Sequence, residues 1–447
     1  MHAKARCPAI LVAAPASGQG KTTVAAALAR LHARQGRRVR VFKCGPDFLD
    51  PCWLAMASGA PVYQLDLWMT GDADCRTRLH EAAAQADLII VEGVMGLFDG
   101  SPSAADLAQR FGLPVLAVVD ASAMAGTFGA LAFGLQHYRS GLRWAGVLAN
   151  RVAGERHASM LQEGLREPGQ WLGALLRNPA FELPDRHLGL VAACEVGDAM
   201  ARLDAAADAL SATPLGQLSA ADLKRWEVVF EPPAQTAPVE PLLQGLTVAV
   251  ARDAAFCFIY QANLDVLQAL GAKLVFFSPL SELALPECDA VWLPGGYPEL
   301  HAEQLSRNHG LRDSLATHVG RNKPVWAECG GMMALFDKLV ATDGQAHELW
   351  GLLPGQVTMQ QRLAALGPQQ LTLGGHTLRG HTFHHSTCDT PLVECTRTAR
   401  PHAEPTAGQG EALYQRGSLR ASYFHAWFPS SPQAVAALLG SAAGDDA

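Results

Sequence analysis

The sequence of 447 residues contains no uninterrupted apolar run of 18 or more residues, which argues against a membrane-spanning helix. Its ten cysteines form no CxxC pair and have no regular spacing, so they indicate reduced thiols in a cytoplasmic protein instead of a zinc site or a disulfide framework. A large charge of one sign is also lacking, because the formal net charge is −7. This balance argues against a dedicated nucleic-acid binder.

The composition is that of a folded protein, with 49% hydrophobic and 17% charged residues, and the length predicts two or three domains. In the first half, short apolar segments alternate with alanine-rich segments of helical periodicity. The expected strands are 9–15, 38–44, 87–93, 113–120 and 144–152. Apolar strands separated by helices are typical of a parallel sheet covered on both faces, so we predict an α/β domain over residues 1–230.

A proline-rich segment, residues 231–245, is predicted to be a linker. The α/β pattern then starts again, which predicts a second domain over residues 246–447. Its expected parallel strands are 246–253, 273–279, 290–296 and 323–331. Two later segments, 371–386 and 418–428, look like antiparallel strands. No internal repeat relates the two halves.

The segment APASGQGKTT (14–23) lies between an expected strand and an expected helix, as a phosphate-binding loop does. Its glycines allow the backbone to curl around phosphate oxygens, Lys21 can reach the β- and γ-phosphates, and the Thr22 hydroxyl can ligate Mg²⁺. The strict pattern GxxxxGK[ST] fails only at its first glycine, where Pro15 stands. The predicted nucleotide-binding residues of this loop are Gly18, Gln19, Gly20, Lys21, Thr22 and Thr23.

Acidic residues follow the second and third apolar strands, in KCGPDFLDP (43–51) and VEGVMGLFDG (91–100). In a parallel sheet both segments emerge at the same edge as the phosphate loop. Because Mg²⁺ prefers oxygen ligands, we predict that Asp47 and Glu92 hold it together with Thr22. For Asp50 and Asp99, a helix cap and a metal ligand remain equally open.

In the second half, KPVWAECGGMMALF (323–336) has the pattern of an apolar strand, a tight turn and a helix, with Cys329 at the turn. A helix amino terminus beside a thiol is expected to lower its pKa and to favour a nucleophilic thiolate. Gly295 and Gly296, with Gly330, are predicted to supply backbone N–H groups to an oxyanion. His425, far along the chain, is the predicted base.

The motifs SGQGKTT, KCGPDFLDP, YQLDLWM (63–69) and VEGVMGLFDG together resemble those of the cobyrinic acid a,c-diamide synthases. The segments LPGGYPEL, AECGGMM and ARDAAFCFIYQANLD (251–265) resemble their class I glutamine amidotransferase domain. This resemblance implies a dethiobiotin-synthetase-like ATP domain, Mg²⁺ bound by Thr22, Asp47 and Glu92, and contact of Asn150 with adenine. It also implies glutamine as nitrogen donor and amidation of the a and c acetates of cobyrinic or hydrogenobyrinic acid through an acyl phosphate, in cobalamin biosynthesis.

Several alternatives stay open. Many class I glutaminases have a carboxylate two residues after the histidine, where this chain has Trp427, so the third catalytic member is unassigned and a glutaminase that needs added ammonia is conceivable. A metal site at His376, His381, His384 and His385 is a weaker alternative, with His381 and His385 expected on one strand face. Other functions are cobyric acid or nickel-sirohydrochlorin amidation, a partitioning-type ATPase, and a glutamine sensor. A homodimer is one of the assemblies that remain open.

Overall fold

The structure is a computed structural model that describes residues 3–186, 189–191, 193–234, 238–401 and 410–440. The chain divides into two compact units, residues 1–235 and 236–447. This division falls within the predicted linker 231–245, of which residues 235–237 lie outside the described residues. Over the described ranges, every helix is too short or too polar to cross a bilayer. No disulfide joins the nine cysteines whose side chains the structure describes.

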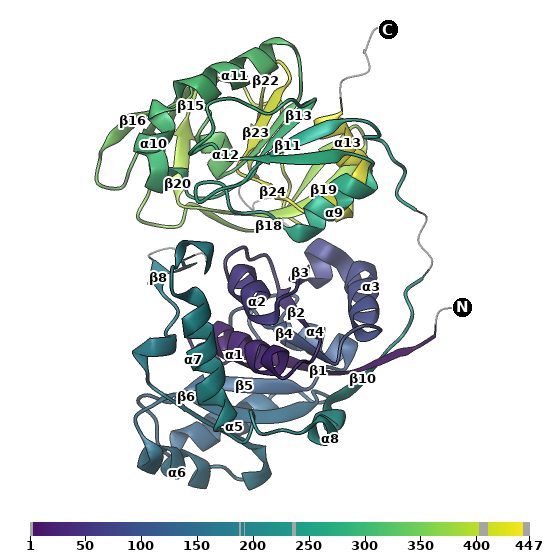
Figure 1. Cartoon of the computed structure of the whole chain (residues 1–447), viewed down its shortest axis with the longest axis vertical. Helices are drawn as coiled ribbons and strands as arrows, with labels where there is room; N and C mark the ends of the chain where they lie inside the picture. Colours follow the sequence, from purple (N-terminus) through teal and green to yellow (C-terminus); the bar gives the residue numbers. More distant parts are fainter. Residues whose placement is uncertain (1–2, 187–188, 192, 235–237, 402–409, 441–447) are drawn as a thin grey trace. The chain divides into compact units, whose positions relative to one another are not determined.

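Unit 1 is built on an eight-stranded sheet with the order β3-β2-β4-β1-β5-β6-β7, and β10 lies beside β1 (Figure 1). The strands are β1 (Ala5–Ala13), β2 (Val39–Cys44), β3 (Tyr63–Leu65), β4 (Leu88–Glu92), β5 (Val115–Asp120), β6 (Trp144–Val152), β7 (Trp171–Leu176) and β10 (Glu227–Phe230). All are parallel except β10, which runs antiparallel to the first residues of β1. The predicted parallel sheet is thus confirmed, and this added pairing explains why β1 begins before residue 9. A two-stranded ribbon, β8 (Asp185–Arg186) and β9 (Gly189–Leu190), lies outside the sheet.

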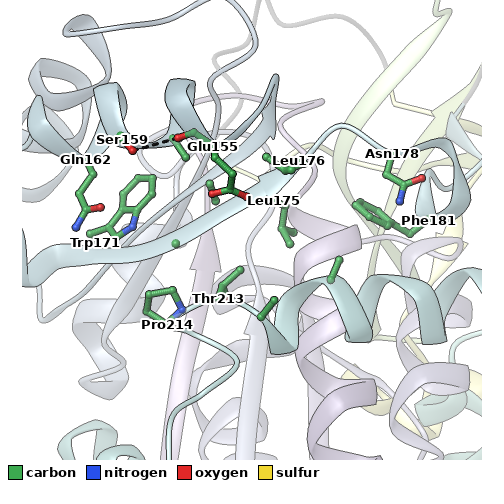
Figure 2. A pocket seen from close by; sticks show the side chains of 15 residues that line it. Glu155, Ser159, Gln162, Trp171, Leu175, Leu176, Asn178, Phe181, Thr213 and Pro214 are labelled. Atoms are coloured by element: carbon green, nitrogen blue, oxygen red, sulfur yellow. Dashed lines mark hydrogen bonds between the residues drawn. The ribbon is translucent and has the colours of Figure 1, made fainter.

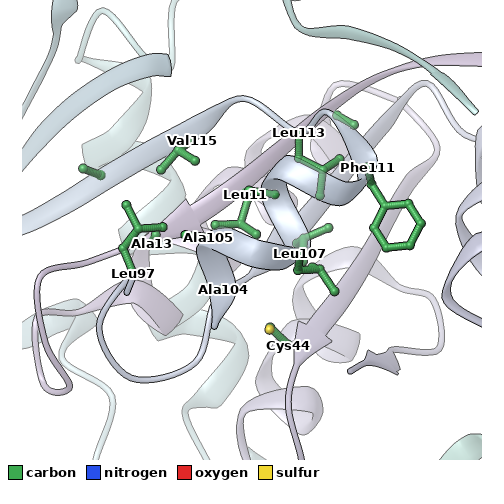
Figure 3. Packing of buried hydrophobic residues seen from close by; sticks show 14 of the residues in the cluster. Leu11, Ala13, Cys44, Leu97, Ala104, Ala105, Leu107, Phe111, Leu113 and Val115 are labelled. Atoms are coloured by element: carbon green, nitrogen blue, oxygen red, sulfur yellow. The ribbon is translucent and has the colours of Figure 1, made fainter. Parts of the chain in front are cut away.

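Helices cover both faces of this sheet, as the alternating pattern predicted. The helices of unit 1 are α1 (Lys21–Arg34), α2 (Asp50–Ser58), α3 (Asp72–Ala83), α4 (Ala104–Phe111), α5 (Thr127–His137), α6 (Glu155–Glu163), α7 (Ala199–Ser211) and α8 (Ala220–Leu223). Apolar residues of α1, α2 and α7 form one core layer with the sheet, and those of α3 to α6 form the other. Figure 3 shows part of the second layer, where Leu11 of β1 packs near Leu107 of α4. A capping box between Ser103 and Asp106 begins α4.

Unit 2 contains a seven-stranded sheet with the order β12-β11-β13-β14-β23-β22-β21. Its strands are β11 (Thr247–Ala251), β12 (Lys273–Phe277), β13 (Ala290–Leu293), β14 (Val325–Glu328), β21 (Thr396–Arg397), β22 (Ala412–Arg416) and β23 (Leu419–Ser422). The first five strands in this order are parallel, and β22 and β21 continue the sheet antiparallel. The helices are α9 (Gln261–Ala269), α10 (Ala302–Arg307), α11 (His309–Gly320), α12 (Gly330–Met333) and α13 (Pro432–Leu439).

Two smaller sheets complete unit 2, with the orders β16-β15-β17-β20 and β18-β19-β24. They are formed by β15 (Phe336–Val340), β16 (Ala346–Glu348), β17 (Leu353–Met359), β18 (Ala365–Leu373), β19 (His376–His384), β20 (Ser386–Asp389) and β24 (His425–Ala426). The antiparallel prediction is correct for the hairpin of β18 and β19, which covers most of 371–386. It is only partly correct for 418–428, because β23 is antiparallel to β22 but parallel to β14.

Candidate active sites

The predicted phosphate loop joins β1 to α1, and both of its glycines adopt backbone angles that favour glycine. Gly18 has φ 75° and Gly20 has φ 91°, in the left-handed region. Gly20 is also sterically required, because a Cβ there would lie 2.1 Å from Nδ2 of Asn150. That amide nitrogen donates to the carbonyl oxygen of Gln19 at 2.9 Å. Asn150 therefore supports the underside of the loop, and its predicted contact with adenine stays a prediction.

Lys21 begins α1 and is folded back onto its own loop. Its Nζ donates to the carbonyl oxygens of Ala16 at 3.1 Å and Met95 at 2.6 Å. The side chain is buried, and burial together with the nearby Lys43 ammonium lowers the pKa of Lys21. A phosphate entering the loop would replace neutral carbonyls with anionic oxygens, which this ammonium group favours. Thr23 follows in the first turn of α1 and is half-buried.

A buried lysine that sequence reasoning did not single out lies at the centre of the acidic residues. Nζ of Lys43, at the end of β2, is 2.5 Å from Oδ2 of Asp50 and 3.0 Å from Oε1 of Glu92. The distance from Nζ to Oδ2 of Asp47 is 3.9 Å. The predicted edge of the sheet thus brings together residues from β2, α2 and β4. The ammonium group offsets much of the cost of burying these carboxylates.

Burial and mutual repulsion raise the pKa of two of these acids. The pKa of Asp47 is about 7 because of burial and the neighbouring Asp50 carboxylate, and burial also raises that of Glu92 to about 7. Burial alone would raise the pKa of Asp50, but Lys43 outweighs it and the net shift is downward. Asp50 is therefore the carboxylate that Lys43 keeps charged.

The two acids left open between cap and ligand have different surroundings. Asp99 accepts a hydrogen bond from the backbone N–H of Gly96 at 2.9 Å, as a turn-stabilising residue does. Asp50 is an ion-pair partner of Lys43. Asp47 combines both roles, because its Oδ1 accepts from the N–H groups of Leu49 at 2.9 Å and Asp50 at 3.0 Å while Oδ2 faces Lys43.

In unit 2, Cys329 occupies the predicted tight turn between β14 and α12. Its backbone has φ 43° and ψ −105°, a strained conformation for a residue with a side chain. The turn is held because the N–H of Cys329 donates to the carbonyl oxygen of Ser422 at 2.8 Å. The side chain is only 5% exposed.

The expected direction of the thiol pKa is wrong. Burial and, next in size, the negative charge of Glu299 raise the pKa of Cys329 well above its ordinary value. Helix α12 is only four residues long, so its terminus supplies little compensation. The environment of this thiol therefore opposes the thiolate in the absence of a ligand.

The predicted oxyanion glycines and the predicted base lie against each other and against the turn. A Cβ at Gly295 would lie 2.4 Å from Cε1 of His425, and a Cβ at Gly330 would lie 2.8 Å from the backbone nitrogen of Gly296. Only residues without side chains permit both approaches. The structure thus brings Gly295, Gly296, Gly330 and His425 together around the turn that contains Cys329.

A carboxylate that the sequence analysis missed lies beside His425. Oε2 of Glu328, the residue before Cys329, is 3.9 Å from Nδ1 of His425, and its Oε1 accepts from Nε1 of Trp326 at 2.7 Å. Burial raises the pKa of Glu328 to about 8 and, together with two neighbouring histidines, lowers that of His425 well below 6.5. His425 is therefore neutral near pH 7 and able to accept a proton.

The histidine cluster does not form the expected row. Strand β19 ends at His384, so alternation does not extend to His385, and the placement of His381 and His385 on one strand face is wrong. His381 stacks on His425 with ring centroids 4.9 Å apart, whereas His384 is 3.2 Å from Oε1 of Glu411. Within the described ranges, no three His, Cys, Asp or Glu residues form a group suited to a metal ion.

A cavity of about 410 Å³ in unit 1 contains none of the predicted residues. Figure 2 shows that it lies along β7, where Gln162 of α6 lies beside Trp171 and Glu155 lies near Leu175 and Leu176. Phe181 and the segment after α7 complete its wall. No basic side chain is among the described residues that line this cavity, so, unlike the loop at Gly18, it has no cationic group that could bind a phosphate.

Comparison with known proteins matches both units. Residues 10–191 match the CobQ/CobB/MinD/ParA nucleotide binding domain, and residues 247–433 match the CobB/CobQ-like glutamine amidotransferase domain. A hydrogenobyrinate a,c-diamide synthase of Pseudomonas aeruginosa is 58% identical over 98% of this chain and 99% of its own length. The chain belongs to the cobyrinate a,c-diamide synthase family.

Other members of the family are similar over comparable lengths. A hydrogenobyrinate a,c-diamide synthase of Stutzerimonas stutzeri is 58% identical over 97% of this chain and 98% of its own length. A cobyrinate a,c-diamide synthase of Herminiimonas arsenicoxydans is 49% identical over 96% of this chain and 95% of its own length. The family resemblance predicted from the motifs is thus confirmed over nearly the whole chain.

Proposed function

We propose that this protein is an ATP- and glutamine-dependent ligase that converts the a and c acetate carboxylates of cobyrinic or hydrogenobyrinic acid into amides during cobalamin biosynthesis. The single observation that carries the proposal is full-length similarity to synthases of this name, in a chain that has a phosphate loop in one unit and a cysteine turn in the other. A partitioning ATPase does not account for the glutamine amidotransferase domain of unit 2.

In unit 2, Cys329 and His425 would release ammonia from glutamine. The thiol proton passes to the neutral imidazole of His425 while sulfur bonds to the side-chain carbonyl carbon of glutamine. Backbone N–H groups of Gly295, Gly296 and Gly330 would stabilise the resulting oxyanion. The imidazolium proton then goes to the leaving nitrogen, ammonia departs, and water hydrolyses the glutamyl thioester to glutamate and the original thiol.

We assign the open third position of this site to Glu328. Its Oε2 lies 3.9 Å from Nδ1 of His425 while Oε1 accepts from Nε1 of Trp326, and a carboxyl group in that position can hold the imidazole ring in one orientation. Glu328 would thus take the role of the carboxylate that many class I glutaminases have two residues after the histidine, although it lies directly before the cysteine in sequence.

In unit 1, the loop residues Gly18, Gln19, Gly20, Lys21, Thr22 and Thr23 would surround the phosphates of ATP. The carboxylate of the corrinoid acid attacks the γ-phosphorus, ADP leaves, and an acyl phosphate forms. Ammonia then attacks the acyl carbon and phosphate departs, which leaves the amide. The ammonium group of Lys21 would stabilise the charge that develops on the transferred phosphoryl group.

Thr22 and one or two carboxylates of this unit are the partial set of oxygen ligands that Mg²⁺ uses beside a bound nucleotide. Oε2 of Glu92 is buried without a hydrogen-bond partner, while its Oε1 accepts from the Thr22 hydroxyl at 2.7 Å. Hard oxygen donors of this kind are those that Mg²⁺ prefers, and phosphates and water can supply the remainder. Thr22, Glu92 and Asp47 would hold the ion, which supplies neutralisation of phosphate charge when bound. Asp50, which is closer to Lys43 than Asp47 is, is a further candidate.

Mass spectrometry of the product from ATP, glutamine and each of the two corrinoid acids tests the proposal. Two exchanges of acid for amide on either compound, dependent on ATP, are expected. Comparison of the two acids assigns the preferred substrate. Glutamate release without any amide product would instead favour a glutamine sensor, and amidation of only another tetrapyrrole acid would move the protein to a different substrate.

A further inference from the structure

Glu299 is a half-buried carboxylate at the cysteine site that the reaction described above does not use. It lies three residues after Gly296, in the helical turn Pro298–His301. A Cβ at Gly330 would meet Gly296 and Pro298 within 2.9 Å, so this turn packs directly against the turn that contains Cys329. This packing places the turn that carries Glu299 against the turn that carries the nucleophile.

The charges that act most strongly on the Cys329 thiol are carboxylates, and Glu299 is the first of them, followed by Glu411 and Glu328. Two of these three carboxylates accept hydrogen bonds from other side chains. Glu411 accepts from the Thr382 hydroxyl at 2.8 Å and contacts His384, and Glu328 accepts from Trp326. Among the described residues, no basic side chain pairs with Glu299 and no other side chain donates to it.

A carboxylate without a basic partner at this position works against the chemistry of the thiol. Its negative charge disfavours the thiolate, and burial raises the pKa of Glu299 itself to about 7. A cation that binds to Glu299 would satisfy the carboxylate and remove its field from Cys329 at the same time. Glutamine carries one cationic group, its α-ammonium.

We propose that Glu299 binds the α-ammonium group of glutamine, and that this ion pair relieves the negative field on Cys329 so that the substrate activates its own nucleophile. The inference rests on the proposed function, because it assumes that glutamine is the ligand of this site. It extends that function by naming the residue that recognises the amino end of the substrate. It also explains how a thiol in an unfavourable resting environment becomes reactive only when glutamine is present.

The test compares glutamine with glutaramate, which has the same amide and carboxylate but lacks the amino group. The intact enzyme, supplied with ATP and corrinoid acid, is assayed for ammonia release from each compound. In Glu299→Gln we expect kcat/KM for glutamine to fall about 10- to 100-fold, the range of a hydrogen bond to a charged group, while that for glutaramate changes little. Synthesis from added ammonium salt should be unchanged, which also shows that the variant is folded.

Two further variants sharpen this test. Glu299→Asp keeps the charge and should retain part of the preference for glutamine over glutaramate. Glu303→Gln is the matched control, because Glu303 is an exposed carboxylate in the next turn that pairs with Arg307 at the protein surface. It should behave as wild type with both compounds.

The electrostatic half of the proposal has its own measurement. Without glutamine, Cys329 of Glu299→Gln should react with iodoacetamide about three- to tenfold faster than wild type, because loss of the carboxylate charge favours the thiolate. Peptide mass spectrometry identifies the alkylated residue. If Glu299 had a purely structural role, Glu299→Gln would lower kcat/KM for both compounds equally and would not accelerate alkylation of Cys329.

The outcomes separate the two proposals. If Glu299→Gln keeps the wild-type preference for glutamine over glutaramate, or loses activity with both equally, the assignment of Glu299 is overturned while the proposed function stands. If wild-type enzyme with all substrates releases no glutamate from glutamine, the proposed function itself is overturned.

Discussion

The phosphate loop of unit 1 and the cysteine turn of unit 2 are built alike, but only the first has ammonium groups among its carboxylates. Each follows a parallel strand, depends on closely packed glycines and leads into a helix. At the first, the ammonium groups of Lys21 and Lys43 lie among the functional residues, whereas at the second the strongest charges acting on Cys329 are carboxylates. The comparison teaches that similar turns can be adapted to an anionic and to a cationic ligand by the few side chains around them.

The largest effect on activity is expected from loss of the nucleophile in the cysteine turn. Cys329→Ser should reduce glutamine-supported synthesis by about 10³-fold or more, because the nucleophile is lost. Ammonium salts should restore synthesis, since unit 1 is untouched. Parallel assays with the two nitrogen sources measure this. Failure of ammonium to restore activity would show that the two turns do not perform separate steps.

The converse change is Glu92→Gln at the phosphate loop. Synthesis from glutamine and from ammonium should both fall about 10²- to 10³-fold, because the change weakens the electrostatic support of phosphoryl transfer. Alkylation of Cys329 should be unaffected. Asp47→Asn and Asp50→Asn compare the two remaining acids, and we expect the larger loss of activity for Asp50→Asn, because Asp50 is the closer partner of Lys43. Asp87→Asn, a surface carboxylate paired with Arg38, is the control and should retain full activity.

Glu328→Gln tests the positioning carboxylate of unit 2. Glutamine-supported kcat should fall by about 10²-fold, the low end of what a positioned acid–base arrangement contributes, with little change in KM. Ammonium-supported synthesis should be retained. Equal loss with both nitrogen sources would indicate disrupted folding instead of a role beside His425.

The same variant has a pH signature. Because burial raises the pKa of Glu328 to about 8, the folded protein keeps a proton that the unfolded chain releases at lower pH. The contribution of Glu328 to the stability of unit 2 should therefore fall by on the order of 3 kcal/mol as the pH rises from about 5 to about 8. Urea unfolding at several pH values measures this, and Glu328→Gln should show a weaker dependence. An identical dependence in the variant would contradict the assignment.

The smallest effect is expected at the support of the phosphate loop. Arg151 donates to the carbonyl oxygen of Gly18 at 2.9 Å and pairs with Asp120 at 2.7 Å, although its side chain is partly exposed. Arg151→Ala should raise the KM for ATP about three- to tenfold, the loss of one hydrogen bond, and leave kcat nearly unchanged. Arg156→Ala, an exposed neighbour, is the control. A change in glutamine KM would contradict this assignment.

Much of the fold was predictable because buried parallel strands are nearly continuous apolar runs. What the runs could not show was pairing between distant segments, such as β10 with β1 or β23 with both β14 and β22. Cys329, Gly295, Gly296 and the loop at Gly18 were predictable from local motifs. His425 was also found, although its partners were not.

The residues that were missed depend on tertiary surroundings. Lys43 lies near the end of an apolar strand, and its role depends on Asp50 and Glu92, which other elements bring into contact with it. Nothing in the sequence distinguishes Glu328 from an ordinary residue before a cysteine, because its position beside His425 depends on the fold. The thiol pKa was mistaken because the helix terminus is visible in the sequence, whereas burial and the field of Glu299 are not.

The pairing of β10 with β1 ties the last strand of unit 1 to its first. Each large sheet is therefore formed by strands from one unit alone, on one side of the division near residue 235. A break in the polypeptide at that point would interrupt no ladder of backbone hydrogen bonds. The same architecture could thus be encoded by two separate genes, and the joined chain guarantees equal amounts of both halves.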